Sequence, residues 1–165
     1  MNVEDFNDII SKTIGRYAHK AVEQSSTALV DLSDSGFMDS ICANIDFPEK
    51  VQDMLLSAAI RTGISTEEIL SDISSISNTK GQEYTNRSED RLSNFKDAAR
   101  RLGLTPIQVL KVYLDKHLCS IQTYIDDIVY GRVGIAYSEP MSGRYADAFL
   151  YTILLQALLM DVQQC

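Results

Sequence analysis

The stretch MSGRYADAFLYTILLQALLMDV, residues 141–162, decides the fold. From Tyr145 to Met160 it is apolar almost all the way round a helix, which is typical of a helix buried in the centre of a bundle or shared with another subunit. Its longest apolar run, from Ala148, is interrupted by polar residues and is shorter than the ~20 residues that span a bilayer. We therefore expect a central core helix, a homo-oligomer as a further consequence, and no membrane contact.

The longest predicted helix lies just before this one, from Pro106 to about Tyr130, and Gly131 closes it. His117 lies within an apolar stripe on this helix, and Lys116 lies at the margin of the stripe. The stripe has helical spacing and comprises Leu110, Tyr113, Leu114, Leu118, Ile121, Tyr124, Ile125 and Ile128.

Proline, glycine and capping residues divide the rest of the chain into further segments with helical spacing. We expect helices over residues 3–24, 25–45, 48–62, 65–76 and 89–102. Residues 77–88 are polar and contain Gly81, so we expect a long loop there. No segment shows convincing strand alternation. The sequence predicts an all-α protein, a compact bundle of about six or seven helices.

Two corners of this bundle share a sequence pattern. Residues 58–66 (AAIRTGIST) match residues 98–106 (AARRLGLTP). In each copy a helix ends at a glycine suited to the left-handed conformation, and a hydroxyl residue, Ser65 or Thr105, caps the next helix. We expect two helix-turn-helix corners, with an N-terminal region (residues 1–75) and a C-terminal region (residues 76–165) sharing one core in a chain of 165 residues.

The chain is acidic, with 23 Asp and Glu against 15 Lys and Arg and a formal net charge of −8. This balance disfavours binding to nucleic acid, which depends on Lys and Arg. The three cysteines show no metal-ligand spacing, and the acidic first residues lack the basic start of a signal peptide. We expect a cytoplasmic protein. A DNA-binding helix-turn-helix remains an alternative that needs a local basic surface at Lys96, Arg100 and Arg101.

Ionisable residues at apolar helix positions are the candidates for a ligand site. Asp147 lies in the apolar final helix, with Arg144 three residues before it and Tyr151 four residues after it. These three residues form either a structural network or part of a cavity in which Arg144 binds phosphate through two hydrogen bonds. Lys116 and His117 offer a cation and a hydrogen-bond donor to an anionic ligand, although a lone histidine on an apolar face is more often a core residue.

The predicted polar loop adds Lys80, Glu83 and Tyr84 to the candidates, because loops rich in charged and aromatic residues often form binding sites. The sequence contains no phosphate-binding P-loop, no glycine-rich dinucleotide turn and no zinc-protease or nucleophile-elbow motif. We therefore expect a binding protein rather than an enzyme.

Four motifs in the second half, considered together, carry a family resemblance. They are KGQEY (80–84), DRLSNFK (90–96), YLDKH (113–117) and SEPMSGR (138–144), followed by Asp147 and Tyr151. In this order and spacing, over about residues 76–160, they resemble a group of small phage and prophage proteins. They are more distantly similar to the nucleotide-modification-associated helical domain. The resemblance implies a viral origin, a location in the host cytoplasm and a nucleotide-related role.

The resemblance also implies site residues. The positions that match its pattern are Lys80, Tyr84, Asn94, Phe95, Lys116, Asp147 and Tyr151. Glu83 departs from the usual Asp, and the paired-glutamate metal motif of the all-α nucleotide pyrophosphatases is absent. This departure argues against hydrolysis and leaves nucleotide binding open.

Three hypotheses follow. In the first, the protein binds a nucleotide or another phosphate-bearing ligand through Lys80, Lys116, His117 and Arg144. Asp147 or Glu83 would then hold a divalent metal ion or ligand hydroxyls. In the second, it is a virus-encoded inhibitor of a host defence protein, such as an anti-CRISPR factor, and its acidic surface contacts that protein. In the third, it is a helix-turn-helix DNA-binding regulator.

Overall fold

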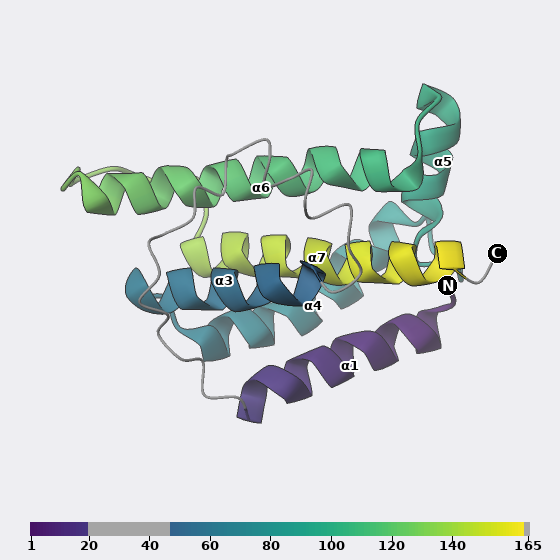
Figure 1. Ribbon diagram of the computed structural model, residues 1–165, viewed down its shortest axis with the longest axis horizontal. Helices are drawn as coiled ribbons and strands as arrows, with labels where there is room; N and C mark the ends of the chain where they lie inside the picture. The colour runs from purple at the N-terminus through teal and green to yellow at the C-terminus, as the bar shows by residue number, and fades with distance from the viewer. Residues whose placement is uncertain (20–46, 164–165) are drawn as a thin grey trace.

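The computed structural model describes residues 1–19 and 47–163, and within these ranges it contains six α-helices and no strand (Figure 1). The helices are α1 (Val3–His19), α3 (Phe47–Arg61), α4 (Thr66–Tyr84), α5 (Ser93–Leu102), α6 (Pro106–Val129) and α7 (Met141–Gln163). The all-α prediction is confirmed. The helix predicted over residues 25–45, and the predicted end of the first helix at residue 24, lie outside the described residues.

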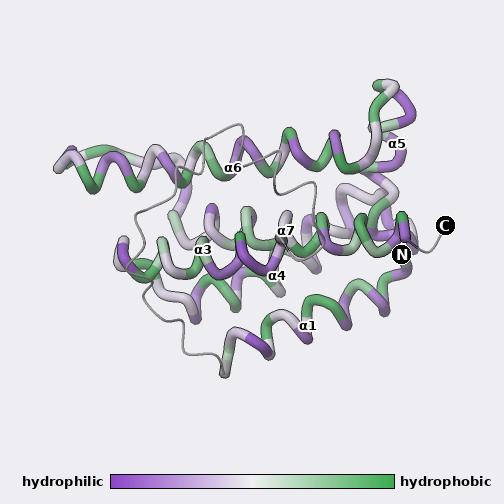
Figure 2. Tube along the Cα trace, in the orientation of Figure 1, coloured by the Kyte–Doolittle hydropathy of each residue, from purple (hydrophilic) through white to green (hydrophobic). Residues whose placement is uncertain are grey.

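Helix α7 is the central element of the bundle. It packs against α1, α3, α4 and α6, and the fully buried rings of Tyr145 and Phe149 lie in its first half. Every residue from Tyr145 to Leu150 is buried, so α7 has no solvent face over this stretch. Figure 2 shows apolar (green) stretches along α7, which lies among the other helices. The prediction of a central apolar C-terminal helix is confirmed.

By length and composition alone, α7 also qualifies as a membrane span. However, 61% of its most apolar window is buried inside the bundle. This burial is typical of a core helix, whose apolar surface is covered by neighbouring helices.

Helix α6 lies along α7 and supplies much of the rest of the core. The buried residues of its predicted stripe are Leu110, Leu114, Leu118, Ile121 and Ile125. Tyr113 and Ile128, which the stripe also included, are about half exposed. Ile128 is exposed because the last turns of α6 extend past the end of α7 (Figure 1).

Both predicted corners form as expected. Gly63 and Gly103 adopt positive φ angles of 77° and 67°, a conformation in which a side chain would be strained. The Ser65 hydroxyl accepts a hydrogen bond from the N–H of Glu68 (3.3 Å) and caps α4. Thr105 and Gln108 form a complete capping box at the start of α6.

The predicted loop over residues 77–88 is wrong, because α4 continues to Tyr84. Ser77 follows Ile69 and Ile73 on the buried face of α4, and its small side chain continues the helical spacing without an apolar signal. The helix ends in a turn in which Asn86 and Arg87, rather than a glycine, adopt positive φ angles of 49° and 58°.

The predicted start of the next helix at Glu89 is also wrong, since α5 begins at Ser93. The residues before it form hydrogen-bonded turns. The N–H of Asp90 donates to the Ser88 hydroxyl (3.1 Å), and the N–H of Leu92 donates to the Asp90 carboxylate (3.0 Å). Ser and Asp side chains of this kind compete with helical hydrogen bonds and favour turns.

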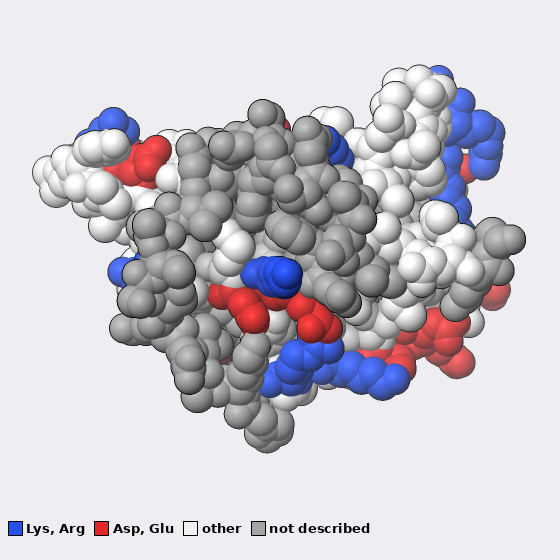
Figure 3. Space-filling view, viewed as in Figure 1, with Lys and Arg blue, Asp and Glu red and all other residues white. Residues whose placement is uncertain are grey.

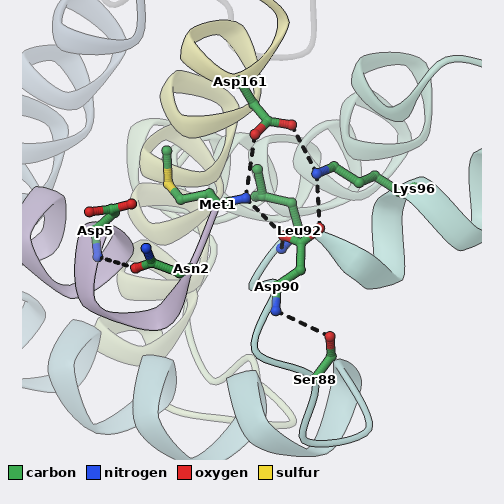
Figure 4. Close-up of polar contacts among 8 residues, drawn as sticks. All are labelled: Met1, Asn2, Asp5, Ser88, Asp90, Leu92, Lys96 and Asp161. Carbon is green, nitrogen blue, oxygen red and sulfur yellow. Dashed lines mark hydrogen bonds and ion pairs between the residues drawn. The ribbon is translucent and has the colours of Figure 1, made fainter. Parts of the chain in front are cut away.

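A ring of four charged groups joins the start of the chain to α5 and α7 (Figure 4). The terminal ammonium of Met1 lies 3.1 Å from a carboxylate oxygen of Asp90 and 3.3 Å from one of Asp161. The Nζ of Lys96 lies 2.9 Å from the second oxygen of each carboxylate. Two positive and two negative groups therefore alternate around a closed ring, which we call the ion-pair ring.

The ion-pair ring shifts the pKa values of Asp90, Asp161 and Lys96. Burial alone would raise the pKa of Asp90, but hydrogen bonds from Lys96 and from the N–H of Leu92 hold it below its ordinary value. The hydrogen bond from Lys96 likewise lowers the pKa of Asp161. Burial would lower the pKa of Lys96, but the hydrogen bonds with both carboxylates raise it. The ring is therefore most stable with all of its groups charged.

Candidate functional site

A pocket of about 560 Å³ lies between α4, α5, α6 and α7. Phe6 of α1 and Glu139 of the α6–α7 loop complete its wall. Its volume is in the range typical of small-molecule sites. The polar and aromatic side chains that line it are those of Phe6, Ser77, Lys80, Tyr84, Thr85, Arg91, Asn94, Phe95, Arg101, Tyr113, Lys116, His117, Glu139, Asp147 and Tyr151.

The pocket brings together eight of the ten candidate residues named from the sequence. These are Lys80, Tyr84, Asn94, Phe95, Lys116, His117, Asp147 and Tyr151. They come from four different helices, so the fold rather than the sequence order makes them neighbours. The continuation of α4 is what places Lys80 and Tyr84 on the pocket wall instead of in a loop.

Lys80 is the ion-pair partner of Asp147. The Nζ of Lys80 lies 3.1 Å and 3.3 Å from the two carboxylate oxygens of Asp147, whose side chain is almost fully buried. The sequence pointed to Arg144 and Tyr151 as the partners of Asp147, and for the ion pair this is wrong. Arg144 precedes Asp147 by nearly one turn of α7, but its guanidinium extends toward α6, whereas Lys80 reaches across from α4.

Arg144 does not line the pocket. Its guanidinium donates hydrogen bonds to the hydroxyls of Ser120 and Ser138, and its Nε lies 3.5 Å from the Glu139 carboxylate. Arg144 thus fastens the loop before α7 to α6. Its role in the structure is to hold that loop, and through it to place Glu139 beside the pocket.

Glu83 does not line the pocket either. It lies on the exposed side of α4, whereas Ser77, Gly81 and Tyr84 lie on the pocket side. With 3.6 residues per turn, the position directly before Tyr84 points about 100° away from it. The proposed role of Glu83 in holding a metal ion or ligand hydroxyls therefore has no support from its place in the fold.

Arg91 is the main pocket residue that the sequence did not single out. Only 6% of its surface is exposed, and its Nε is fully buried without a hydrogen-bond partner. Among the described residues, its guanidinium forms no hydrogen bond and no ion pair. A buried charge left without a partner is costly, so this arrangement differs from an ordinary structural arginine.

Gly81 makes room for Arg91. A Cβ built at Gly81 would lie 3.2 Å from the Cζ of Arg91 and closer still to its Nη1. The guanidinium therefore packs directly on the backbone of α4, and any side chain at position 81 would move it. A glycine within a helix is the sequence signal that could have indicated this close approach.

Two more buried polar atoms of the pocket lining have no hydrogen-bond partner. They are the hydroxyl of Ser77 and the side-chain carbonyl oxygen of Asn94. Buried polar atoms are nearly always paired, so three unpaired ones in a single pocket indicate groups that a ligand or water would satisfy.

Aromatic rings form the wall on the α6 side. The rings of Tyr113 and Tyr151 are stacked with centroids 6.1 Å apart, and His117 lies 5.1 Å from Tyr151. Phe95 makes edge contacts with both tyrosines. Tyr113 remains 47% exposed, so part of its surface is open at the pocket. We call Phe95, Tyr113, His117 and Tyr151 the aromatic wall.

Burial governs the protonation of the two titratable groups at the centre of this wall. Burial lowers the pKa of His117, an effect that nearby Asp147 opposes and nearby Lys116 reinforces. Burial raises the pKa of Tyr151 to about 12, and Asp147 adds to this effect. At neutral pH the imidazole is therefore uncharged, with one nitrogen that donates and one that accepts.

The pocket is positively charged although the chain is acidic. Its lining contains the four cations Lys80, Arg91, Arg101 and Lys116 against the two carboxylates Glu139 and Asp147. Anionic groups are thus favoured in this pocket over neutral or cationic ones. Neither in the pocket nor in the rest of the described ranges is a cluster of three or more His, Cys, Asp and Glu side chains placed to hold a metal ion.

The basic residues required by the DNA-binding hypothesis are divided among other contacts. Lys96 belongs to the ion-pair ring, Arg100 lies 3.0 Å from Asp97, and Arg101 lines the pocket. In Figure 3 basic atoms gather over α5, while along α1 they alternate with acidic atoms. The surface shown therefore has no extended basic stripe.

No family model, curated protein or solved structure matches the chain.

Proposed function

We propose that the protein binds a nucleotide or another small phosphate-bearing ligand in the pocket between α4, α5, α6 and α7. The observation that carries this proposal is Arg91, a buried cation without a partner among the described residues. A guanidinium binds phosphate through two parallel hydrogen bonds, and that of Arg91 has no competing partner among the described residues. Lys116 and Arg101 add positive charge at the same pocket.

The resemblance of residues 76–160 to small phage proteins agrees with this proposal, since it implies a nucleotide-related role. On the same basis we infer a viral origin and a site of action in the cytoplasm of the host cell. The proposal concerns binding, and no reaction is assigned to the pocket.

The test is a thermal-shift series with common nucleotides, cyclic oligonucleotides and inorganic phosphate at millimolar concentration. A ligand present at 100 times its dissociation constant should stabilise the protein by about 2.7 kcal/mol. The proposal fails if none of these compounds raises the melting temperature by more than about 1 °C, a shift that corresponds to only a few tenths of a kcal/mol.

Two arginine variants make the test specific to the pocket. Arg91→Met should abolish the ligand-induced shift, because it removes the buried guanidinium. Arg100→Met is the matched control, since Arg100 is exposed on α5, pairs with Asp97 and does not line the pocket. Equal loss of binding in both variants would show that overall charge, rather than the pocket, is responsible.

A second candidate function, inhibition of a host defence protein by direct contact, is favoured by apolar side chains exposed at both ends of α6. They are Leu102, Leu104 and Val112 at one end and Ile128, Val129, Tyr130 and Val133 at the other. Self-association through the same residues would give a homo-oligomer. Light scattering and a pull-down with Val112→Glu and Val133→Glu variants test this candidate, and unchanged behaviour of both variants would rule out these surfaces.

A further inference from the structure

We propose that the ligand is a nucleoside monophosphate, with its phosphate at Arg91 and its base on the aromatic wall. This inference rests on the proposed function and specifies the class of ligand. It comes from the division of the pocket into two chemically different parts and from the number of charges in it.

The phosphate part lies where α4 meets the start of α5. Arg91 packs there against the backbone of Gly81, and the unpaired oxygens of Ser77 and Asn94 belong to the same two segments. The Ser77 hydroxyl can donate a hydrogen bond to a phosphate oxygen, whereas the unpaired oxygen of Asn94 is an acceptor suited to an N–H or O–H group of the ligand. A phosphate bound to Arg91 would thus meet a fixed cation and the Ser77 hydroxyl.

The base part is the aromatic wall. Asn94 and Phe95 are adjacent in α5, so the two parts of the pocket are next to one another. Tyr113 stacks on Tyr151 and still has about half of its surface exposed, which leaves room for a planar ring against it. Bases of every kind stack on such aromatic faces.

The neutral imidazole of His117 gives this wall both a donor and an acceptor. Phosphate alone would use neither the rings nor the acceptor nitrogen. The wall therefore favours a ligand that contains a planar, hydrogen-bonding ring system over a simple sugar phosphate.

The charge of the pocket matches a single phosphate monoester. Four cations against two carboxylates leave an excess of two positive charges, and Lys80 is already engaged by Asp147. A phosphate monoester carries about −1.5 to −2 at neutral pH. A triphosphate would bring further negative charge close to the carboxylates of Glu139 and Asp147, so it should bind more weakly.

The experiment is isothermal titration calorimetry of the whole chain with matched probes. The probes are the 5′-monophosphates of adenosine, guanosine, cytidine and uridine, the corresponding nucleosides, ribose 5-phosphate, inorganic phosphate and adenosine 5′-triphosphate. At least one monophosphate should bind about tenfold or more tightly than its own nucleoside, than ribose 5-phosphate and than the triphosphate.

Three variants separate the two parts of the pocket. Arg91→Met should reduce monophosphate affinity to that of the nucleoside. Tyr113→Ala should reduce it to that of ribose 5-phosphate, and Tyr113→Phe, which keeps the ring, should restore it. Tyr130→Ala removes a tyrosine that is 70% exposed and outside the pocket, and it should leave every affinity unchanged.

The possible results distinguish this inference from the proposed function. If ribose 5-phosphate or the triphosphate binds as tightly as every monophosphate, the assignment to a nucleoside monophosphate is overturned and phosphate binding stands. If Arg91→Met keeps full monophosphate affinity, the phosphate position is overturned. If none of the phosphate compounds binds, the proposed function fails as well.

Discussion

The backbone N–H of Arg91 donates a hydrogen bond to the backbone carbonyl of Met1 over 3.1 Å. Asp90, the neighbour of Arg91, is held at the same place by the terminal ammonium of Met1 and by Lys96. The ion-pair ring therefore fixes the backbone from which the pocket guanidinium extends. Its residues Asp161 and Lys96 do not line the pocket themselves.

Lys96→Met should weaken both the fold and the pocket. Removing the ammonium leaves two carboxylates with one cation between them, and we expect a loss of about 1 kcal/mol in the free energy of unfolding, since the ring is partly exposed. Affinity for the pocket ligand should fall several-fold as Arg91 loses its support. Urea unfolding and calorimetry measure the two effects. Lys12→Met, which breaks the exposed Lys12–Asp8 pair on α1, is the control and should change neither by much.

The ion-pair ring also predicts a pH dependence. The pKa values of Asp90 and Asp161 are lowered in the folded state, so their stabilising contribution is complete above the ordinary value of 3.8 and is lost as the pH falls through the lowered values. Urea unfolding across this acid range should show a steeper loss of stability for the native chain than for Asp161→Asn. Parallel curves for the two proteins would contradict the role given to the ring.

Arg91→Met should stabilise the ligand-free protein. The substitution removes a buried charge that has no partner among the described residues and replaces it with an apolar side chain of similar length. The expected gain in the free energy of unfolding is about 1–3 kcal/mol. A functional residue is often retained at such a cost in stability. Urea unfolding would contradict this interpretation if the variant were clearly less stable, because Arg91 would then be a structural residue.

Gly81→Ala should separate stability from binding. Alanine favours a helix over glycine by roughly 0.5–1 kcal/mol, and the atoms that its Cβ would meet belong to the end of the Arg91 side chain. We expect stability to change little while ligand affinity drops about tenfold or more, because the guanidinium must move. Gly15→Ala on α1, where a Cβ meets nothing within 4 Å, should raise stability and leave binding unchanged. Thermal unfolding and calorimetry on both variants give the comparison.

Thr152→Val should be destabilising although it preserves shape. The Nε2 of Gln52 donates to the Thr152 hydroxyl over 3.1 Å, and both residues are completely buried between α3 and α7. Valine would leave this donor unpaired, at a cost of about 1–3 kcal/mol in the free energy of unfolding. Thr123→Val, whose hydroxyl bonds a carbonyl on the exposed side of α6, should cost much less. Equal effects in urea unfolding would show that the buried pair contributes nothing.

Helical spacing and capping residues were sufficient to predict most of the fold. The all-apolar segment from Tyr145 to Met160 predicted the central helix, and the two glycine corners predicted where α3 and α5 end. The extension of α4 could not be predicted, because its pocket side carries Ser77 and Gly81 in place of apolar residues. Positions that face a polar pocket have no hydrophobic signal, so the sequence pattern favours a loop there.

The candidate site was predictable only in part. Lys116, His117 and Asp147 were visible as ionisable residues in apolar helices, and the pocket includes all three. The side chains that they contact could not be predicted. The ion pair between Lys80 and Asp147, for example, joins residues that are 67 positions apart. Arg91 appeared in the sequence only as part of the motif DRLSNFK and was not named as a site residue. It lies in an ordinary polar turn, and only the tertiary fold makes it buried and unpaired.

The central place of α7 has a consequence for how the chain is made. The helices that surround it are all translated earlier. Until α7 is available, the apolar faces that they pack against it stay exposed. We expect the nascent chain to remain collapsed but unfinished until the last helix emerges, and to depend on chaperones until then. Once α7 packs between them, the surrounding helices should fold into the native bundle in one cooperative step.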